Sequence, residues 1–513
     1  MTEPESPAAV PRGEPPAPAP VARTAPDAAP APARAPVPVA PTAPDAAPAP
    51  GAGPTGEFHV PVRELLSLTV PALVVGIGCA LTLWGLSALA TALQHLLWDD
   101  LSGAFGLTKD SRLWIAIMLL LTAVLVGLVV TYAPGHAGPD PATTGLVEKP
   151  LPLTALPGLA VALVLVLAGG VSLGPENPIM AINAALVTVF GARVARGTRA
   201  PLWISLSTAG TIGAMFGTPV AAALMFSELD LGDRRIPLWD RLFPPLVAAT
   251  AGSLTMSQVA SDLSMRLDLP HYTDLRLRDL GLAVAIALVT AALGVLAAYV
   301  FTPLHRAFRR TRRPFLAIVL GGVVLAGLGA LGGPTTLFKG LDEMKGLPSL
   351  ADAKGGWWFL GIALVKLAAL LVASASGFRG GRIFPATFVG AAIGFGIHGL
   401  WPGVPLALAV SCAVVGIVVA ATRSGWLSLF LAIALVPDTL LLMPCLLATL
   451  AAWLLVTNRP ELRATDLDPT PAPAPVVPTG AGAPAASDAG SEPGPDGAAV
   501  SADGPVPPPS PGR

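Results

Sequence analysis

Long apolar stretches separated by short polar gaps follow one another from Leu65–Trp98 to Leu440–Val456. A straight membrane-spanning helix needs about 20 apolar residues, and several of these stretches are shorter or are interrupted by Gly and Pro. The first stretch is about 34 residues long, which is longer than a helix perpendicular to the membrane needs, and this indicates a tilted helix. Broken helices are tolerated inside a bilayer only where their free backbone groups face protein or a water-filled cavity. The pattern predicts an all-α polytopic membrane protein with broken, tilted and half-spanning helices.

Composition agrees with burial in lipid and narrows the possible functions. Of 513 residues, 53% are hydrophobic and 12% are charged, whereas soluble domains carry about 25% charged residues. The formal net charge of -1 argues against a nucleic-acid partner, which requires a basic face. The three cysteines lie far apart in apolar runs without metal-ligand spacing, so we expect no metal and no cofactor. No pairing of a nucleophile with a base recurs along the chain, and we do not expect an enzyme.

Both ends of the chain differ in composition from the middle. Residues 1–58 and 466–513 are dominated by Pro and Ala, with Gly and Ser added in the second stretch. Such segments cannot bury enough apolar surface to offset the entropy lost on ordering, so we expect two disordered tails. Residues 59–465 are then the membrane domain.

A dense basic segment, His305–Arg313, lies between two apolar runs. The positive-inside rule places such a loop in the cytoplasm. Binding of phosphate or lipid is an alternative role for the same residues.

Two interrupted segments indicate an internal repeat. Gly174–Pro178 (GPENP) and Gly380–Pro385 (GGRIFP) each precede an apolar helix, and they lie about 207 positions apart. Thr218-Pro219 and Ser424-Gly425 also each precede an apolar helix, and these two pairs lie about 206 positions apart. Matching broken segments in two halves are the best pointer in a sequence to a membrane substrate site. We expect inverted halves at about 65–260 and 275–463.

Glu176 is the most informative single residue. A carboxylate in an apolar region costs roughly 2.5–3.5 kcal/mol on insertion scales and so requires a reason. It lies at the start of a predicted helix, where unpaired N–H groups and the positive end of the helix dipole attract an anion. The carboxylate of Glu176 can therefore fill an anion site itself and, once protonated or displaced, leave that site to a permeating ion.

The second interrupted segment has complementary chemistry. Its glycines allow the backbone to approach a ligand, and a helix starting near Pro385 directs further N–H groups at the site. Arg379 and Arg382 add positive charge, which favours anions over cations. Lys366, in the preceding apolar run, is expected to snorkel, to pair with a carboxylate or to lie near a pore.

These segments together resemble the CLC chloride channel and transporter family. Gly174–Pro178 is similar to its GREGP motif, with Glu176 at the gating glutamate, and Gly381–Pro385 is similar to its GxFxP motif. Ala137–Pro141 lies where GSGIP is expected, and Phe216–Leu224 resembles the helix start FNAPLAGILF. The resemblance covers roughly residues 65–463.

The resemblance implies a homodimer in which each subunit has its own pore, with both tails in the cytoplasm. It implies chloride or another small anion as the substrate, in the cytoplasmic membrane. It also implies a set of anion-binding positions: Gly138 or Pro139, Gly174, Asn177, Arg382, Ile383, Phe384 and Leu462. Gly138 and Leu462 replace a serine and a tyrosine of the family, so we expect backbone N–H groups to dominate the anion site.

The mode of transport is open at this stage. The proton-transfer glutamate of family antiporters corresponds to Leu229, which cannot carry a proton, and this favours channel-like conduction gated by Glu176. An alignment shifted by one residue places Glu228 in that role and predicts a proton-coupled antiporter. A degenerate, non-conducting membrane scaffold is the third hypothesis.

Overall fold

The computed structural model describes residues 60–145, 149–194, 200–228, 236–260 and 265–464. Within these ranges the regular structure is helical, apart from an isolated antiparallel bridge between Gly174 and Gly381. Both predicted tails, 1–58 and 466–513, lie outside the described residues.

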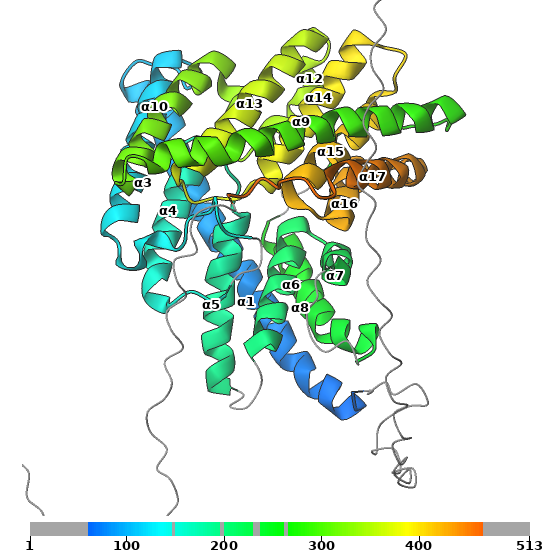
Figure 1. The fold of residues 1–513 in the computed structure, drawn as a ribbon. Helices are drawn as coiled ribbons and strands as arrows, with labels where there is room; N and C mark the ends of the chain where they lie inside the picture. The colour runs from blue at the N-terminus through cyan, green and yellow to red at the C-terminus, as the bar shows by residue number, and fades with distance from the viewer. Residues whose placement is uncertain (1–59, 146–148, 195–199, 229–235, 261–264, 465–513) are drawn as a thin grey trace, which may run out of the picture. The chain divides into compact units, whose positions relative to one another are not determined.

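The helices are shown in Figure 1. The longer ones, in chain order, are α1 (Val62–His95), α3 (Arg112–Tyr132), α4 (Leu156–Ala168), α5 (Glu176–Val194), α6 (Ala200–Phe216), α7 (Pro219–Glu228), α8 (Leu238–Val259), α9 (Leu277–Arg309), α10 (Pro314–Gly332), α13 (Gly356–Ser376), α14 (Ile383–Leu400), α15 (Leu406–Thr422), α16 (Gly425–Leu435) and α17 (Leu442–Val456). Short helices fill the connections: η1 (Leu96–Asp100), α2 (Leu101–Ala104), η2 (Pro134–Ala137), η3 (Leu153–Ala155), η4 (Pro334–Thr336), α11 (Leu341–Lys345), α12 (Leu347–Leu350) and η5 (Thr439–Leu441).

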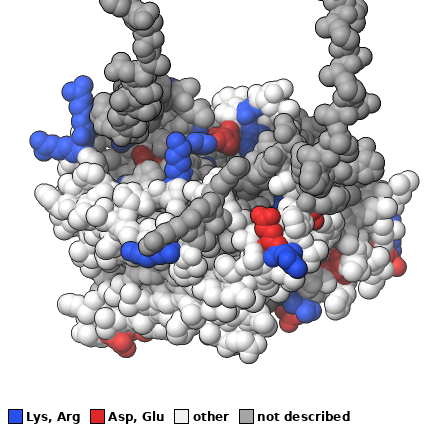
Figure 2. All heavy atoms as spheres, turned by 90° about the horizontal axis from the view of Figure 1, so that it is seen from below, with Lys and Arg blue, Asp and Glu red and all other residues white. Residues whose placement is uncertain are grey.

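Length and hydropathy divide the described helices into two groups. Eight of the described helical segments are long and apolar enough to cross a membrane, and the longest of them, Val62–Ala104, has 43 residues. Others are apolar but shorter, among them α6, α7 and α16. On the face drawn in Figure 2, uncharged residues cover most of the surface and the charged ones gather in separate patches. The expected all-α polytopic membrane fold with short helices among long ones is confirmed.

The order of helices repeats along the chain. The helices α5, α6 and α7 begin at Glu176, Ala200 and Pro219, and α14, α15 and α16 begin 207, 206 and 206 positions later. The apolar run 202–227 is divided into α6 and α7 at Gly217, whose φ of 69° is accessible to glycine without strain. The division into two inverted halves stays our prediction, and this succession supports it.

Small residues allow the backbones of α1, α6 and α8 to approach closely. A Cβ atom added to Gly76 of α1 would overlap the carbonyl oxygen of Ala248 in α8, and one added to Gly213 of α6 would overlap that of Ala249. Membrane helices lack a hydrophobic driving force toward one another, so such backbone contact is a main source of their association.

We predict that Gly76→Ala lowers the free energy of unfolding by about 1–3 kcal/mol, because the new methyl group must push α1 away from α8. Gly78→Ala is the matched control. It lies on the same helix with no atom within 4 Å of the added Cβ, and we expect it to be neutral or stabilising by up to about 1 kcal/mol. Denaturant unfolding of the detergent-solubilised protein measures both, and equal effects of the two variants would show that this contact is unimportant.

Candidate functional site

The starts of α5 and α14 meet through their backbones. The Gly174 N–H donates to the Gly381 carbonyl oxygen at 2.9 Å, and the Gly381 N–H donates to the Gly174 carbonyl oxygen at 2.7 Å. These two residues are 207 positions apart, which is the spacing of the predicted repeat. Equivalent residues that bond reciprocally are the arrangement expected about a local two-fold axis between inverted halves.

Glu176 is the first residue of α5, and its carboxylate lies at the start of α14. The residue is 0% exposed, and its Oε1 accepts a hydrogen bond from the Phe384 N–H at 2.7 Å. That N–H belongs to the first turn of α14, where the helix leaves donors unpaired and carries partial positive charge. The other oxygen, Oε2, is buried without a hydrogen-bond partner among the described residues. The carboxylate therefore occupies a position suited to an anion.

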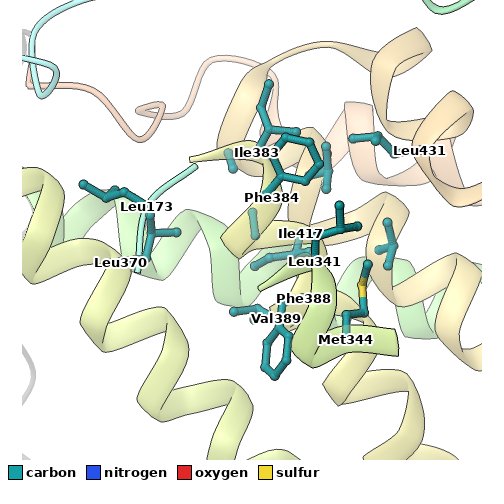
Figure 3. Close-up of a cluster of buried hydrophobic side chains, with 14 of the residues drawn as sticks. Leu173, Leu341, Met344, Leu370, Ile383, Phe384, Phe388, Val389, Ile417 and Leu431 are labelled. Carbon is teal, nitrogen blue, oxygen red and sulfur yellow. The ribbon is translucent and has the colours of Figure 1, made fainter. Parts of the chain in front are cut away.

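Several side chains beside this contact are apolar. Figure 3 shows Leu173, Ile383 and Phe384 in a cluster of buried hydrophobic residues. The ring of Phe384 lies 6.1 Å from that of Phe216, which in turn lies 5.8 Å from Phe430. Exclusion of water strengthens the attraction between a charge and backbone dipoles, so the carboxylate is held more firmly here than in an exposed site.

Two glycines make room for the carboxylate. A Cβ atom added to Gly174 or to Gly381 would overlap the carboxylate oxygens of Glu176. Neither glycine has a positive φ, so the requirement is for space and not for an unusual backbone conformation.

The two arginines that the sequence singled out attach a neighbouring loop to this site. Arg379 Nη2 donates to the carbonyl oxygens of His136 and Gly138, both at 2.9 Å. Arg382 Nη2 donates to the Thr144 carbonyl oxygen at 3.1 Å. Gly138, with a φ of 77°, thus reaches the site through its carbonyl. The arginines fix the loop as well as adding positive charge, a clamping role that the sequence did not predict.

A cavity of about 300 Å³ adjoins the two helix starts. Asn177, Arg382 and Ile383 line it beside the helix starts, and Glu228 lines it from α7. Pro139 lines a separate small cavity, which Asn177, Arg379 and Gly380 also border. The structure therefore brings Asn177, Arg382, Ile383 and Glu228 together around one space.

Leu462 lies in the segment after α17. It is 3% exposed, and its neighbours Glu461 and Arg463 line the 300 Å³ cavity. The adjacent Ala464 N–H donates to the Ala142 carbonyl oxygen at 2.8 Å, which joins this segment to the loop that follows Gly138.

Glu228 caps a helix of the second half, as Glu176 does. Its Oε1 accepts from the Trp426 N–H at 2.7 Å, and its Oε2 is hydrogen-bonded to the hydroxyl of Ser424, the residue that precedes α16. The alternative candidate, Leu229, lies outside the described residues.

Sequence reasoning missed Arg423. Its guanidinium donates to the carbonyl oxygens of Val456, Arg459 and Pro460, which lie at and just beyond the end of α17. The residue has a φ of 55° between α15 and α16. A lone arginine between two apolar runs, followed directly by Ser-Gly, was the signal that could have found it.

Lys366 lies near a carboxylate, Glu343, which was one of the roles expected for it, and it also binds backbone carbonyl oxygens, which the sequence did not predict. It is 0% exposed and donates from Nζ to the carbonyl oxygens of Leu337 and Phe338, at 2.5 and 2.9 Å. Its ammonium also lies 5.0 Å from the ring centroid of Phe388 in α14. Burial raises the pKa of the Glu343 carboxyl in α11, and the nearby Lys366 ammonium partly opposes this rise. Lys366 thus anchors the segment before α11.

No group of three or more His, Cys, Asp or Glu side chains with the geometry of a metal site occurs among the described residues. The three cysteines are buried and free.

An apolar bundle in which two helix starts meet at a buried carboxylate is the architecture of a membrane ion-transport protein. Residues 118–457 match the model of a family described as voltage gated chloride channel. The chain is 48% identical over 412 residues to the ion-transport protein YfeO of Salmonella typhimurium and of Salmonella newport, which covers 80% of this chain and 100% of each relative. The chain belongs to the voltage-gated chloride channel (CLC) family.

Solved structures show the same fold. A CLC-type fluoride/proton antiporter matches with a TM-score of 0.60 and 21% identity, over 77% of this chain and 96% of that one. A slow cyanobacterial Cl-/H+ antiporter matches with a TM-score of 0.63 and 15% identity, over the same shares of both chains. A eukaryotic CLC transporter matches with a TM-score of 0.60 and 15% identity, over 78% of this chain and 74% of that one.

We predict that Gly381→Ala lowers the free energy of unfolding by about 1–3 kcal/mol, because the added methyl group displaces the Glu176 carboxylate from α14. In a Glu176→Ala background the clashing oxygens are gone, so the same substitution should cost less. A double-mutant cycle on the solubilised protein measures the difference, which we expect to be about 0.5–3 kcal/mol. Additive effects would show that Gly381 does not make room for this carboxylate.

Proposed function

We propose that this protein carries chloride or a similar small anion across the cell membrane, in a channel-like manner, with Glu176 as the gate. The observation that carries this proposal is the hydrogen bond from the Phe384 N–H to the buried Glu176 carboxylate. A helix start that holds a carboxylate oxygen offers the same donors to a halide once that oxygen has left.

The anion site in this proposal is built mainly from backbone. Gly174, Ile383 and Phe384 surround the gate with peptide groups, while Asn177 and Arg382 face the adjoining cavity. Gly138, Pro139 and Leu462 contribute no hydroxyl group. A site made of amide dipoles stabilises charge without fixing the chemical identity of the anion. We therefore propose a broader anion selectivity than a site with two hydroxyl ligands would have.

The assembly and orientation belong to the same proposal. We propose a homodimer in which each subunit conducts separately, with both chain ends in the cytoplasm. The basic segment 305–313 supports this orientation, because five of its nine residues are arginines: Arg306, Arg309, Arg310, Arg312 and Arg313.

Proton-coupled exchange is the second candidate, and one observation favours it. Glu228 borders the same 300 Å³ cavity as Asn177 and Ile383, which adjoin the gate. A carboxylate there can exchange protons between the cavity and one side of the membrane. The similar solved structures described as antiporters support this second candidate at the level of the fold.

We predict that Glu176→Gln raises chloride efflux from proteoliposomes about ten- to a hundredfold at neutral pH and removes its pH dependence. The neutral amide loses a charged hydrogen bond to the Phe384 N–H, worth about 1.5–3 kcal/mol, and no longer titrates. In the wild type, protonation of the gate weakens the same bond, so efflux should rise as the pH falls. Glu64→Gln, at an exposed position in the first turn of α1, is the control.

Two results would contradict this prediction. One is unchanged efflux and pH response in Glu176→Gln. The other is the absence of any anion flux in the wild type, which would instead support a non-conducting scaffold.

The coupling of protons decides between the two modes of transport. Channel-like conduction predicts that an imposed chloride gradient moves no protons against their own gradient. Exchange predicts that the wild type moves protons, that Glu228→Gln abolishes this movement, and that chloride flux persists. Glu461→Gln, which alters another carboxylate of the same cavity, is the matched control. Simultaneous recording of chloride and pH outside proteoliposomes gives the answer.

A further inference from the structure

A third cavity, larger than the two described above, lies beside the turn between α9 and α10. Its volume is about 550 Å³. Arg309, Arg312 and Arg313 line it from the turn, and Arg379 lines it from the loop before α14. The cavity thus joins the basic segment of the sequence to a residue that clamps the candidate transport site.

Positive charge predominates around this cavity. Four of its lining residues are arginines, and Asp140 is its one lining carboxylate among the described residues. The Asp140 Oδ2 lies 3.9 Å from Arg309 Nη1 and 3.7 Å from the Nε2 of the buried His305. Arg312 and Arg313 are exposed, and within the described part of the chain no ion pair is found for either. One carboxylate cannot neutralise four guanidinium groups.

A buried donor at this cavity also lacks an acceptor. Arg379 is 6% exposed, and although its Nη2 is bonded, its Nε has no hydrogen-bond partner among the described residues. A buried donor that is left unsatisfied costs about 1–3 kcal/mol, and more when it is charged. An acceptor supplied from the cavity would remove that cost.

We propose that this cavity binds a phosphate group, either on a soluble phosphate compound or on the headgroup of an anionic lipid. Guanidinium groups bind phosphate oxygens in pairs of parallel hydrogen bonds, and several arginines around one space suit an oxyanion with several oxygens. A volume of about 550 Å³ is far larger than a halide ion requires and lies in the range of pockets for organic ligands. The proposed ligand is therefore larger than the transported anion.

The ligand also regulates transport through Arg379. Arg379 donates hydrogen bonds to the carbonyl oxygens of His136 and Gly138. A phosphate that binds its Nε therefore interacts with the same guanidinium group that holds this loop in place. Binding and transport are then linked by one side chain. This regulatory part rests on the proposed anion transport, whereas binding does not.

The binding experiment uses the full-length protein in detergent and inorganic pyrophosphate as the soluble probe, followed by titration calorimetry. Arg312→Gln and Arg313→Gln should each weaken binding about tenfold. Arg310→Gln is the matched control, because it removes the same charge from the same exposed turn but does not line the cavity. If all three variants weaken binding equally, binding depends on the overall positive charge of the turn and not on the cavity, and the proposal is overturned.

A parallel arm tests lipid. Native mass spectrometry measures retention of phosphatidic acid against phosphatidylcholine, in the wild type and in the same three variants. Selective retention of phosphatidic acid that Arg312→Gln or Arg313→Gln reduces, without pyrophosphate binding, identifies a lipid headgroup as the ligand. Binding of pyrophosphate alone identifies a soluble phosphate. Binding of neither probe overturns the proposal.

A last measurement tests regulation. Chloride flux from proteoliposomes should change at least about twofold when the ligand identified above is added, and this response should be weakened in Arg312→Gln but kept in Arg310→Gln. Absence of all flux contradicts the proposed transport function and leaves the binding result intact. Flux that is indifferent to bound ligand contradicts the regulatory link alone.

Discussion

The hydrogen bond between the Glu176 carboxylate and the Phe384 N–H is the interaction on which the rest of the site depends. A carboxylate that is 0% exposed needs compensation for lost hydration, and here the visible compensation comes from the start of a helix in the other half of the chain. That contact requires the two helix starts to meet, as the reciprocal bonds of Gly174 and Gly381 make them do. It also requires glycine at both positions, because a side chain would occupy the space of the carboxylate.

The same arrangement occurs a second time. Glu228, at the end of α7, accepts from the Trp426 N–H near the start of α16, so two carboxylates of the first half lie at two helix starts of the second. One is sealed among apolar side chains, and the other borders a cavity. A shared mode of attachment combined with different access to water is the physical basis for assigning them different roles.

Arginines connect the irregular segments to this framework. Arg379, Arg382 and Arg423 each donate to backbone carbonyl oxygens of loops that are distant in the sequence. Carbonyl groups at helix ends and in loops have no partner of their own inside a membrane protein, and a guanidinium group with five donors can satisfy several at once. The arginines of this protein therefore stabilise irregular backbone segments in addition to providing positive charge that attracts an anion.

Several features could be predicted from the sequence because they follow from local pattern. Long and short apolar runs predicted long and short helices. The carboxylate of Glu176, in the segment Gly174–Pro178, predicted a helix start whose N–H groups stabilise a negative charge. Arg423 and Lys366 could not be assigned in this way. Their acceptors are carbonyl oxygens, which every residue possesses, so no residue type marks the partner. The start of α14 also lies at Ile383, two residues earlier than the proline near which we expected it.

The sequence by itself determined the membrane class, the broken helices and the identity of the carboxylate, since each depends on hydrophobicity, on Gly and Pro, or on a charge that lipid penalises. Tertiary structure alone decided which helix start receives Glu176, which cavity Glu228 borders, and that four arginines surround one further space. The reason is that these outcomes depend on the distance between segments that are far apart in the chain, 208 positions for Glu176 and Phe384 and 198 for Glu228 and Trp426. Local pattern carries no information on that distance until the backbones have packed.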